Sequence, residues 1–389
     1  ISNMLKVGFI GVGNTGNQIA AIAQTKIADL PVVAINSSQK DLDTIPETVK
    51  KFLITDKKGE SQGAGKNRTL AKTYLKDSIL ALINDQEMKA FCSTLEVVFV
   101  CGSTGGGTGS GVTPLLLSAL SQIYPDTLFI LIGIGPVESE ALTAQVNTLE
   151  YLKELYGNIK NVHYMLYDND NFDNMPSHKM MEHVNDEVVE DIKVLMGMYN
   201  KETRYDSIDT EDGLRLISSP GRIVVARVED VKEKDLDQAS LEERLIKAIK
   251  NNAHMELQRD QKVMATGVIS NLSEQFSAEF NVHIPRVHEL IGEPVNEFLH
   301  TYINEDKKEP NSVYLIMTGL SPVNDKITKI TERINEIEER QRIQEEASAL
   351  DESKIDTLSN MVRSNTTRDS KDEEGGDLNM DDLFNSFGV

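Results

Sequence analysis

The chain has 389 residues, of which 39% are apolar and 26% are charged, an ordinary balance for a folded protein with a sizeable core. Its net charge of −22 argues against direct nucleic-acid binding by the body of the protein, because phosphate groups repel an acidic surface. No apolar run approaches the roughly 18–20 residues of a membrane-spanning helix, so we expect no membrane partner. Two cysteines do not make a disulfide framework, and they favour a reducing, cytoplasmic location.

Short apolar runs and helical patterns alternate through the first 175 residues. The apolar runs predict buried strands at 5–11, 31–37, 95–102, 127–135 and 161–169. Helical patterns fall between them at 15–26, 67–90, 110–123 and 138–156. Because the strands lack polar/apolar alternation, they predict an α/β fold with a doubly wound, Rossmann-like parallel sheet and helices on both faces.

The rest of the chain predicts a long central helix, a second and smaller α/β domain, and a charged C-terminal helix. The expected elements are a helix at about 177–199, strands at 222–228, 263–270 and 312–319, and helices near 239–251, 286–300 and 325–347. Isoleucines along the last helix form a seam that we expect to pack on its own domain rather than in a coiled coil. The polar, acidic composition beyond residue 351 predicts disorder, and the closing MDDLFNSFGV suits either folding on a partner or an inert tail.

These elements predict six segments. Their boundaries are 4–175 for the N-terminal domain, 176–200 for the central helix, 201–220 for a loop and helix, 221–322 for the second domain, 323–350 for the C-terminal helix and 351–389 for the tail.

Three glycine-rich loops each precede a predicted helix. They lie at the carboxyl ends of the predicted strands, which is where ligands of a parallel sheet bind. They are GVGNTGN, which fits the G-x-G-x-x-G pattern, QGAGKNR at 62–68, and GGGTGSG at 105–111. Glycine lets backbone N–H groups approach an anion at a helix N-terminus, so the loops predict phosphate binding. The third loop lacks the lysine of a P-loop. We therefore expect amides, helix dipoles and Mg²⁺ to balance the phosphate charge, with Lys66 or Arg68 able to add to it.

A G-x-G-x-x-G loop also occurs in dinucleotide-binding dehydrogenases. That class uses an acidic residue about 20 positions further on to hold the ribose. Here the second strand ends in Asn36, Ser37 and Ser38, and no histidine or lysine offers a convincing proton donor. An NAD-dependent oxidoreductase therefore remains only as a remote alternative, behind the two interpretations given below.

The order of these segments is similar to that of the tubulin/FtsZ superfamily: GVGNTGN, INSSQKDL, GAGKN, then GGGTGSG. The resemblance covers about residues 4–320. It implies a domain that binds GTP or GDP with Mg²⁺, and subunits that assemble head to tail into filaments. The third loop of FtsZ usually reads GAGxNPxxG, and FtsZ ends in an apolar and basic peptide, so this chain departs from FtsZ at both places.

The long charged helix and acidic tail look more like the plasmid and phage tubulins of the TubZ type. That resemblance implies filaments for DNA segregation, which reach DNA through a DNA-binding adaptor on the C-terminal region. An FtsZ-like structural protein of cell division is the alternative. A requirement for the tail in binding a DNA–adaptor complex would separate the two.

The resemblance also implies which residues hold the nucleotide. In the loops these are Gly11, Gly13, Asn14, Gly16, Asn17, Gly63, Ala64, Gly65, Gly105, Gly106, Gly107, Thr108, Gly109 and Ser110. Glu140 matches a ribose-binding position, although the family's arginine four residues later is Ala144 here. Asn169, Asn185 and Asp186 match positions beside guanine.

The segment SIDTEDG at 207–213 is similar to the family's catalytic loop, which inserts into the next subunit's nucleotide site. Asp209 and Asp212 match its two acidic positions, and Ser207 replaces the usual asparagine. Two carboxylates three residues apart at a helix start share a face, and they can orient an attacking water. Without the resemblance, they would be interpreted as acids favoured by the helix dipole. With it, they imply that hydrolysis requires assembly.

Overall fold

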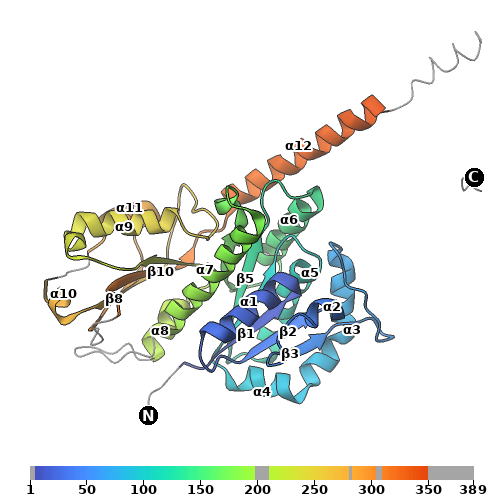
Figure 1. Cartoon of the computed structure of the whole chain (residues 1–389), viewed down its shortest axis with the longest axis horizontal. Coiled ribbons are helices and arrows are strands. Elements are labelled where there is room, and N and C mark those ends of the chain that lie inside the picture. The colour runs from blue at the N-terminus through green and yellow to red at the C-terminus, as the bar shows by residue number, and fades with distance from the viewer. Residues whose placement is uncertain (1–4, 198–209, 280–282, 304–308, 349–389) are drawn as a thin grey trace, which may run out of the picture. The chain divides into compact units, whose positions relative to one another are not determined.

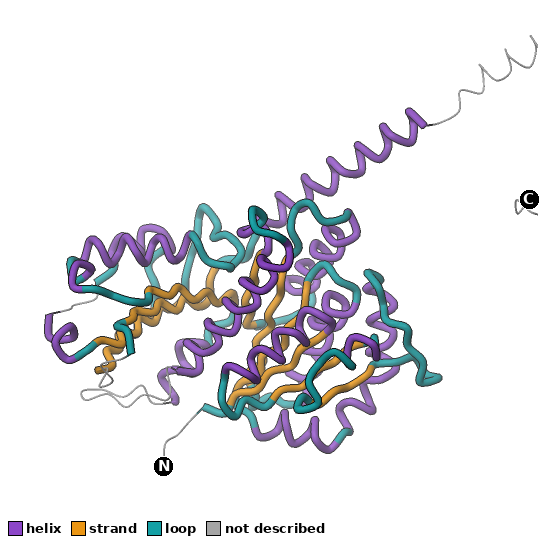
Figure 2. Tube along the Cα trace, in the orientation of Figure 1, coloured by secondary structure: helices purple, strands orange, loops and turns teal. Residues whose placement is uncertain are grey.

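The computed structural model describes residues 5–197, 210–279, 283–303 and 309–348 (Figures 1 and 2). The strands are β1 (Val7–Val12), β2 (Val32–Asn36), β3 (Lys50–Leu53), β4 (Val97–Ser103), β5 (Leu128–Gly135), β6 (His163–Asp168), β7 (Gly221–Val228), β8 (Ala265–Leu272), β9 (Asn296–Ile303) and β10 (Ser312–Leu320). The α-helices are α1 (Gly13–Lys26), α2 (Gln39–Leu42), α3 (Arg68–Asn84), α4 (Gln86–Thr94), α5 (Thr108–Ile123), α6 (Leu142–Gly157), α7 (Ser177–Gly197), α8 (Thr210–Ile217), α9 (Gln238–Lys250), α10 (Glu274–Glu279), α11 (Pro285–Ile291) and α12 (Asn324–Ser348). Two short 3₁₀ helices are η1 (Asn169–Phe172) and η2 (Glu233–Asp235).

The strands of the described chain form one sheet in the order β3-β2-β1-β4-β5-β6-β7-β10-β8-β9. Strands from β3 to β7 run parallel, whereas β10 runs antiparallel to both β7 and β8. The predicted α/β class and parallel N-terminal sheet are confirmed. β6 and β7 meet over only two residue pairs, His163 with Gly221 and Tyr164 with Arg222, so a short junction joins the two sets of strands. The predicted boundaries between domains stay predictions.

Alternate side chains of the parallel strands enter two apolar layers, one on each face of the sheet. Phe9 packs in the layer that holds Ile19 of α1 and Val188 of α7. Ile10 packs in the opposite layer, with Leu116 of α5. Each buried side chain of this size stabilises the fold by roughly 1.5–3 kcal/mol, so both layers hold the sheet rigid. A third cluster lies between strands β7, β8 and β10 and the helices α9 and α11.

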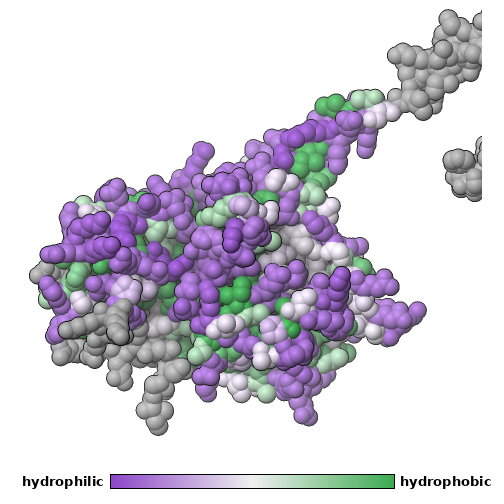
Figure 3. Space-filling model, viewed as in Figure 1, coloured by the Kyte–Doolittle hydropathy of each residue, from purple (hydrophilic) through white to green (hydrophobic). Residues whose placement is uncertain are grey.

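Figure 3 shows that the face in view is largely hydrophilic, in keeping with the charge of the chain. Among the helices of the described chain, none combines the length and the apolar character needed to cross a membrane.

The prediction of a single helix over 67–90 is wrong, because Asp85 divides it. The backbone of Asp85 is extended, with φ −61° and ψ 133°. Its carboxylate accepts hydrogen bonds from the N–H groups of Glu87 and Met88, and so it caps a new helix, α4. A short polar residue at a helix start satisfies amides that have no partner inside the helix.

The prediction of a helix near 286–300 is wrong over its second half. α11 ends at Ile291, and Gly292 follows with φ 91°, a left-handed conformation that favours glycine. The next residues form β9, which pairs in parallel with β8. The sequence analysis also missed β3, whose KKFL contains only two apolar residues.

The isoleucine seam of α12 packs on the domain that precedes it, as predicted. Ile330 and Ile334 are buried in the layer that contains α5 and α6, and Ile327 is partly buried against it. Residues 1–337 form one compact unit. In the unit that begins at residue 338, the last turns of α12 are described, and the predicted tail at 351–389 lies outside the described residues.

The first testable consequence concerns Gly16, where α1 crosses β4. A Cβ atom at this position would collide with the carbonyl oxygen of Cys101 and lie 3.0 Å from its carbonyl carbon. Backbone atoms of a central strand cannot give way. Gly16→Ala should therefore lower the free energy of unfolding by about 3 kcal/mol, measured by urea denaturation.

Gly157→Ala is the matched control, because an added Cβ there meets nothing within 4 Å. At this last residue of α6, alanine should be neutral or should stabilise the protein by up to about 1 kcal/mol. Equal stabilities for the two variants would contradict the close approach at residue 16.

Candidate functional site

Three glycine loops meet at the carboxyl edge of the parallel strands. Gly13, with φ 71°, passes the chain from β1 into α1, and a Cβ there would lie 2.9 Å from the backbone nitrogen of Gly109. A Cβ on Gly107 would collide with the carbonyl oxygen of Gly65 and lie 3.1 Å from the nitrogen of Asn67. The third loop therefore touches both the first and the second. All three predicted loops come together, and their backbones are in direct contact.

The third loop presents backbone N–H groups that have no partner. In the part of the chain that the structure describes, no acceptor contacts the N–H groups of Gly105, Gly106 and Gly107. Gly107 is also the N-cap of α5, and it offers no side chain to the first turn of that helix. Unpaired amides at a helix N-terminus carry partial positive charge. Their arrangement suits a bound anion such as a phosphate group.

Asn147 on α6 holds the carbonyl groups of two glycine loops. Its Nδ2 donates toward the carbonyl oxygens of Lys66 at 2.9 Å, Gly105 at 3.2 Å and Gly106 at 3.1 Å. In a trans peptide the C=O and the following N–H point in opposite directions. Asn147 therefore turns the N–H groups of Gly106 and Gly107 away from itself.

Asn147 was not predicted to be a site residue, although its position in the sequence carried a signal. It lies three residues after Ala144 and four before Tyr151, two positions on the buried face of α6. A polar residue on a buried helical face needs partners, because burying an unpaired amide costs roughly 1–3 kcal/mol.

The two hydroxyl residues of GGGTGSG have different surroundings. The Oγ1 atom of Thr108 lies 2.7 Å from the Oγ of Ser37, so the end of β2 supports the third loop. Ser37 was noted only for the lack of an acid there. Ser110 is buried, and its Oγ accepts a hydrogen bond from Nε of Arg68 at 2.7 Å. Its hydroxyl therefore faces α3 rather than the glycine loops.

The cations near the loops already have carboxylate partners. Arg68 forms an ion pair with Glu154 at 2.7 Å, and it is almost completely buried. Lys66 lies 3.7 Å from Glu140, and both side chains are partly exposed. Arg68 is therefore a structural cation, whereas Lys66 and the predicted ribose-binding residue Glu140 stand together at the rim of the site.

Two buried oxygen atoms at this edge have no hydrogen-bond partner. One is Oδ1 of Asn169, which begins η1 directly after β6. The other is Oδ1 of Asn17, whose Nδ2 donates to the carbonyl oxygen of Ile35 at 3.1 Å. Buried polar atoms without a partner are rare in folded proteins, so these two indicate positions where a ligand or water completes the bonding.

The other predicted site residues divide between the interior and the surface. Asn185 of α7 is buried, whereas its neighbour Asp186 is exposed and pairs with Lys26 of α1 at 3.0 Å. Asn14 is exposed, and it accepts a hydrogen bond from Gln18 at 3.3 Å. Asn185 thus lies inside the fold, while Asp186 helps to join α1 to α7.

Of the two predicted catalytic acids, Asp212 belongs to a different part of the fold. Asp209 lies outside the described residues, and so does Ser207. Asp212 lies in the first turn of α8. In that turn only the backbone is described, whereas the side chains of the later residues of α8 are described as well. α8 packs against the second set of strands, where its Leu216 fills the space over Gly267 of β8.

Both cysteines are structural. Burial raises the pKa of Cys92 to about 12, and it raises that of Cys101 even further. Both thiols therefore stay neutral and act as small buried apolar side chains. Within the described chain, no group of three or more histidine, cysteine, aspartate or glutamate residues could hold a metal ion.

Glycine loops gathered over helix N-termini at the carboxyl edge of a parallel sheet define an α/β domain with anion-binding geometry. Residues 6–176 match the family model for the GTPase domain of the Tubulin/FtsZ family. The N-terminal part of this chain is therefore similar to the GTPase domain of the tubulin/FtsZ family, and the resemblance inferred from the loops is confirmed.

Similar proteins come from several branches of that family. The tubulin-like protein CetZ of Pyrococcus abyssi is 27% identical over 239 residues, which are 59% of this chain and 63% of the relative. The tubulin-like protein TubZ of a Clostridium botulinum C phage is 31% identical over 144 residues, 37% of this chain and 38% of the relative. A GTPγS-bound protofilament of CetZ2 from Haloferax volcanii has a TM-score of 0.69 at 20% identity, covering 86% of this chain and 100% of that one.

The match to the CetZ relative thus leaves more than a third of that relative's length unmatched. TubZ and FtsZ were the two branches predicted from the sequence, and CetZ was not among them.

Proposed function

We propose that this protein binds and hydrolyses GTP and that it polymerises head to tail into filaments. The observation that carries the proposal is the row of unpaired amides at Gly105, Gly106 and Gly107, next to the uncapped start of α5 in a tubulin/FtsZ-family domain. Nucleotide phosphates are the anions that satisfy such amides in α/β domains.

The nucleotide lies along the carboxyl edge of the sheet. Its phosphates contact the three glycine loops, Glu140 contacts the ribose, and Asn169 and Asn185 contact the guanine base. The orphaned Oδ1 of Asn169 supports the base assignment, because it can accept a hydrogen bond from a guanine N–H.

Mg²⁺ fits this site as an ion that the nucleotide carries in. The site offers the hydroxyl groups of Thr108 and Ser37, and the described residues hold no carboxylate cluster there. Mg²⁺ commonly keeps several waters and binds through substrate phosphates, where it neutralises their charge.

Hydrolysis is completed in trans by the acidic loop of the next subunit. Asp212 lies in the first turn of α8, which packs on β8 in the second set of strands, and Asp209 precedes that helix in the sequence. A head-to-tail contact would bring this region of one subunit to the glycine loops of its neighbour. The CetZ2 protofilament supports such a contact in a protein of the same fold.

The cellular role that we favour is segregation of plasmid or phage DNA through a DNA-binding adaptor on the C-terminal region. The net charge of −22 suits a filament that leaves DNA contact to a basic partner. The similarity to a tubulin-like protein of a phage fits this role, and the similarity to a cell division protein FtsZ makes a division filament the alternative. The family match disfavours the oxidoreductase.

Light scattering after addition of GTP and Mg²⁺, with phosphate release followed in the same sample, tests the GTPase filament. The wild type should assemble and then disassemble as phosphate appears. Asp212→Ala should assemble but release phosphate at least 100-fold more slowly, because it lacks a carboxylate that orients the attacking water. Glu243→Ala, an exposed acid on α9, should behave like the wild type. Rapid hydrolysis by unassembled protein would contradict the proposal.

Asn147→Ala tests the orientation of the phosphate-binding amides. It should weaken GDP binding by roughly 1–3 kcal/mol, because the released carbonyls let the loop turn. GDP at 100 times the wild-type Kd should stabilise the wild type by about 2.7 kcal/mol in a thermal melt and stabilise the variant far less.

Thr148→Val is the matched control for Asn147→Ala. Its hydroxyl lies 2.9 Å from the Oγ1 of Thr104, and valine keeps its shape. It should lose some stability and keep its response to GDP. A full GDP response in Asn147→Ala would contradict the role of the amide.

A further inference from the structure

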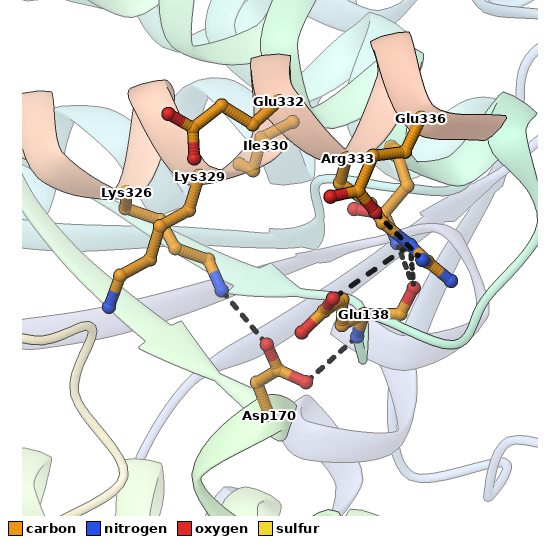
Figure 4. A pocket seen from close by; sticks show the side chains of 9 residues that line it. Glu138, Asp170, Lys326, Lys329, Ile330, Glu332, Arg333 and Glu336 are labelled. Atoms are coloured by element: carbon orange, nitrogen blue, oxygen red, sulfur yellow. Dashed lines mark hydrogen bonds and ion pairs between the residues drawn. The ribbon is translucent and has the colours of Figure 1, made fainter. Parts of the chain in front are cut away.

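The base end of the candidate nucleotide site is fastened to the C-terminal helix by ion pairs. Lys326 of α12 lies 2.7 Å from Oδ2 of Asp168 and 3.2 Å from Oδ2 of Asp170. The side chain of Asp168 is 4% exposed and that of Lys326 is 14% exposed, so water screens this cluster little. Figure 4 shows Lys326 directed from α12 toward Asp170.

We propose that Lys326 is a positioning residue for the base-binding turn and that it couples the docking of α12 to nucleotide binding. The inference rests on the proposed function, and it adds a residue and a helix that no recognised loop of the site contains.

The two aspartates form the turn that carries Asn169. Asp168 is the N-cap of η1, and its Oδ1 accepts a hydrogen bond from the N–H of Asp170 at 3.2 Å. Asn169 lies between them, with its buried and unpaired Oδ1. Lys326 neutralises both carboxylates, which would otherwise repel each other within one turn. Loss of the ammonium group would leave Asp168 as a buried, unpaired charge, so the turn would have to open to water.

The same cluster reaches the loop between β5 and α6. Oδ1 of Asp170 accepts a hydrogen bond from the N–H of Glu138 at 2.8 Å. One turn of helix beyond Ile330, Nε of Arg333 donates to the carbonyl oxygen of Glu138 at 3.3 Å (Figure 4). Glu140, the candidate ribose contact, is two residues further along this loop. Both loops at the base end therefore rest on α12.

The ion pairs with Asp168 and Asp170 are the dominant interactions of Lys326. Burial acts to lower the pKa of Lys326, but the charges of Asp168 and Asp170 outweigh it, and the pKa lies above its ordinary value. Two other cations on this helix have their own partners. Lys329 forms an ion pair with Glu256, and Arg333 forms one with Glu138. Lys326 therefore stays charged near neutral pH.

Coupling follows from linkage. If α12 must be docked for Asn169 to meet the base, then a bound nucleotide must stabilise the docked helix by the same factor. GDP and GTP share the base and the ribose, so both should have this effect.

Lys326→Met tests the proposal, because methionine keeps much of the apolar stem and removes the charge. We expect the affinity for GDP, measured by calorimetry, to fall about tenfold or more, and the preference for GDP over ADP to fall with it. In the wild type, GDP should slow amide hydrogen exchange across residues 324–337, and in the variant this slowing should be lost.

Lys329→Met is the matched control, because Lys329 is on the same helix, is 63% exposed and pairs with Glu256 at 2.8 Å. It should keep the GDP affinity within about twofold, as expected for an exposed pair. Asp170→Asn, which keeps the pair between Lys326 and Asp168, should shift both readouts in the same direction by a smaller factor. If Lys326→Met does not fold, the Asp170→Asn variant still tests the positioning role of Lys326.

The outcomes separate the inference from the proposed function. A wild type that binds neither GDP nor GTP overturns the proposed function, and this inference falls with it. A wild type that prefers GDP, together with variants that lose stability but keep both that preference and the exchange response to GDP, overturns the positioning role alone.

Discussion

Backbone-to-backbone contact among the three glycine loops is the constraint on which the rest of this structure depends. At Gly13, Gly16 and Gly107 the nearest neighbour of an added Cβ is a main-chain atom of another loop or strand. A side chain at any of these places would push a helix N-terminus away from the sheet edge. Because glycine has no Cβ atom, the three loops can approach one another closely at the starts of α1 and α5. The entropic cost of so many glycines is about 0.5–1 kcal/mol each, and the two apolar layers of the sheet offset it.

A second feature of the site is that the cations near it are already paired with carboxylates. Arg68 pairs with Glu154, Lys66 with Glu140, and Lys326 with Asp168. Each of these cations lies near the site, and each already has a carboxylate partner. Under the proposed function, in a protein with a net charge of −22, the phosphate charge would then be met by backbone amides, the α5 dipole and a metal ion carried in by the ligand. The missing P-loop lysine fits this arrangement.

Features with a local cause could be predicted from the sequence. The five apolar runs of the N-terminal sheet were found because both faces of a parallel strand are buried, which makes the run nearly continuous. The glycine loops were found because glycine spacing reports directly on backbone contacts. β3 was missed because KKFL lies at the edge of the sheet and is only partly buried.

What the sequence hid depends on distant partners. Asn147 gains its meaning from Lys66, 81 residues earlier, and Lys326 gains its meaning from Asp168, 158 residues earlier. A lone asparagine or lysine in a helical pattern does not reveal such a partner. Asp85 is a different case, because its capping role is local, and the helical periodicity on either side concealed it.

The two ends of the proposed nucleotide are bound by different interactions, backbone amides at one end and side chains at the other. This difference determines which change in the nucleotide each end can detect. The phosphate end is built from rigid backbone, so a missing γ-phosphate leaves amides unpaired there, and only the glycine loops can respond. In our proposal the base end depends on Asn169 and on the turn formed by Asp168 and Asp170, which Lys326 joins to α12. Because GDP and GTP would present the same base to that turn, α12 would distinguish a loaded subunit from an empty one, but it would not distinguish the two nucleotides by this route. A difference between GTP and GDP in filament stability would therefore travel through the contacts among the three glycine loops, and α12 would act on assembly as a sensor of occupancy.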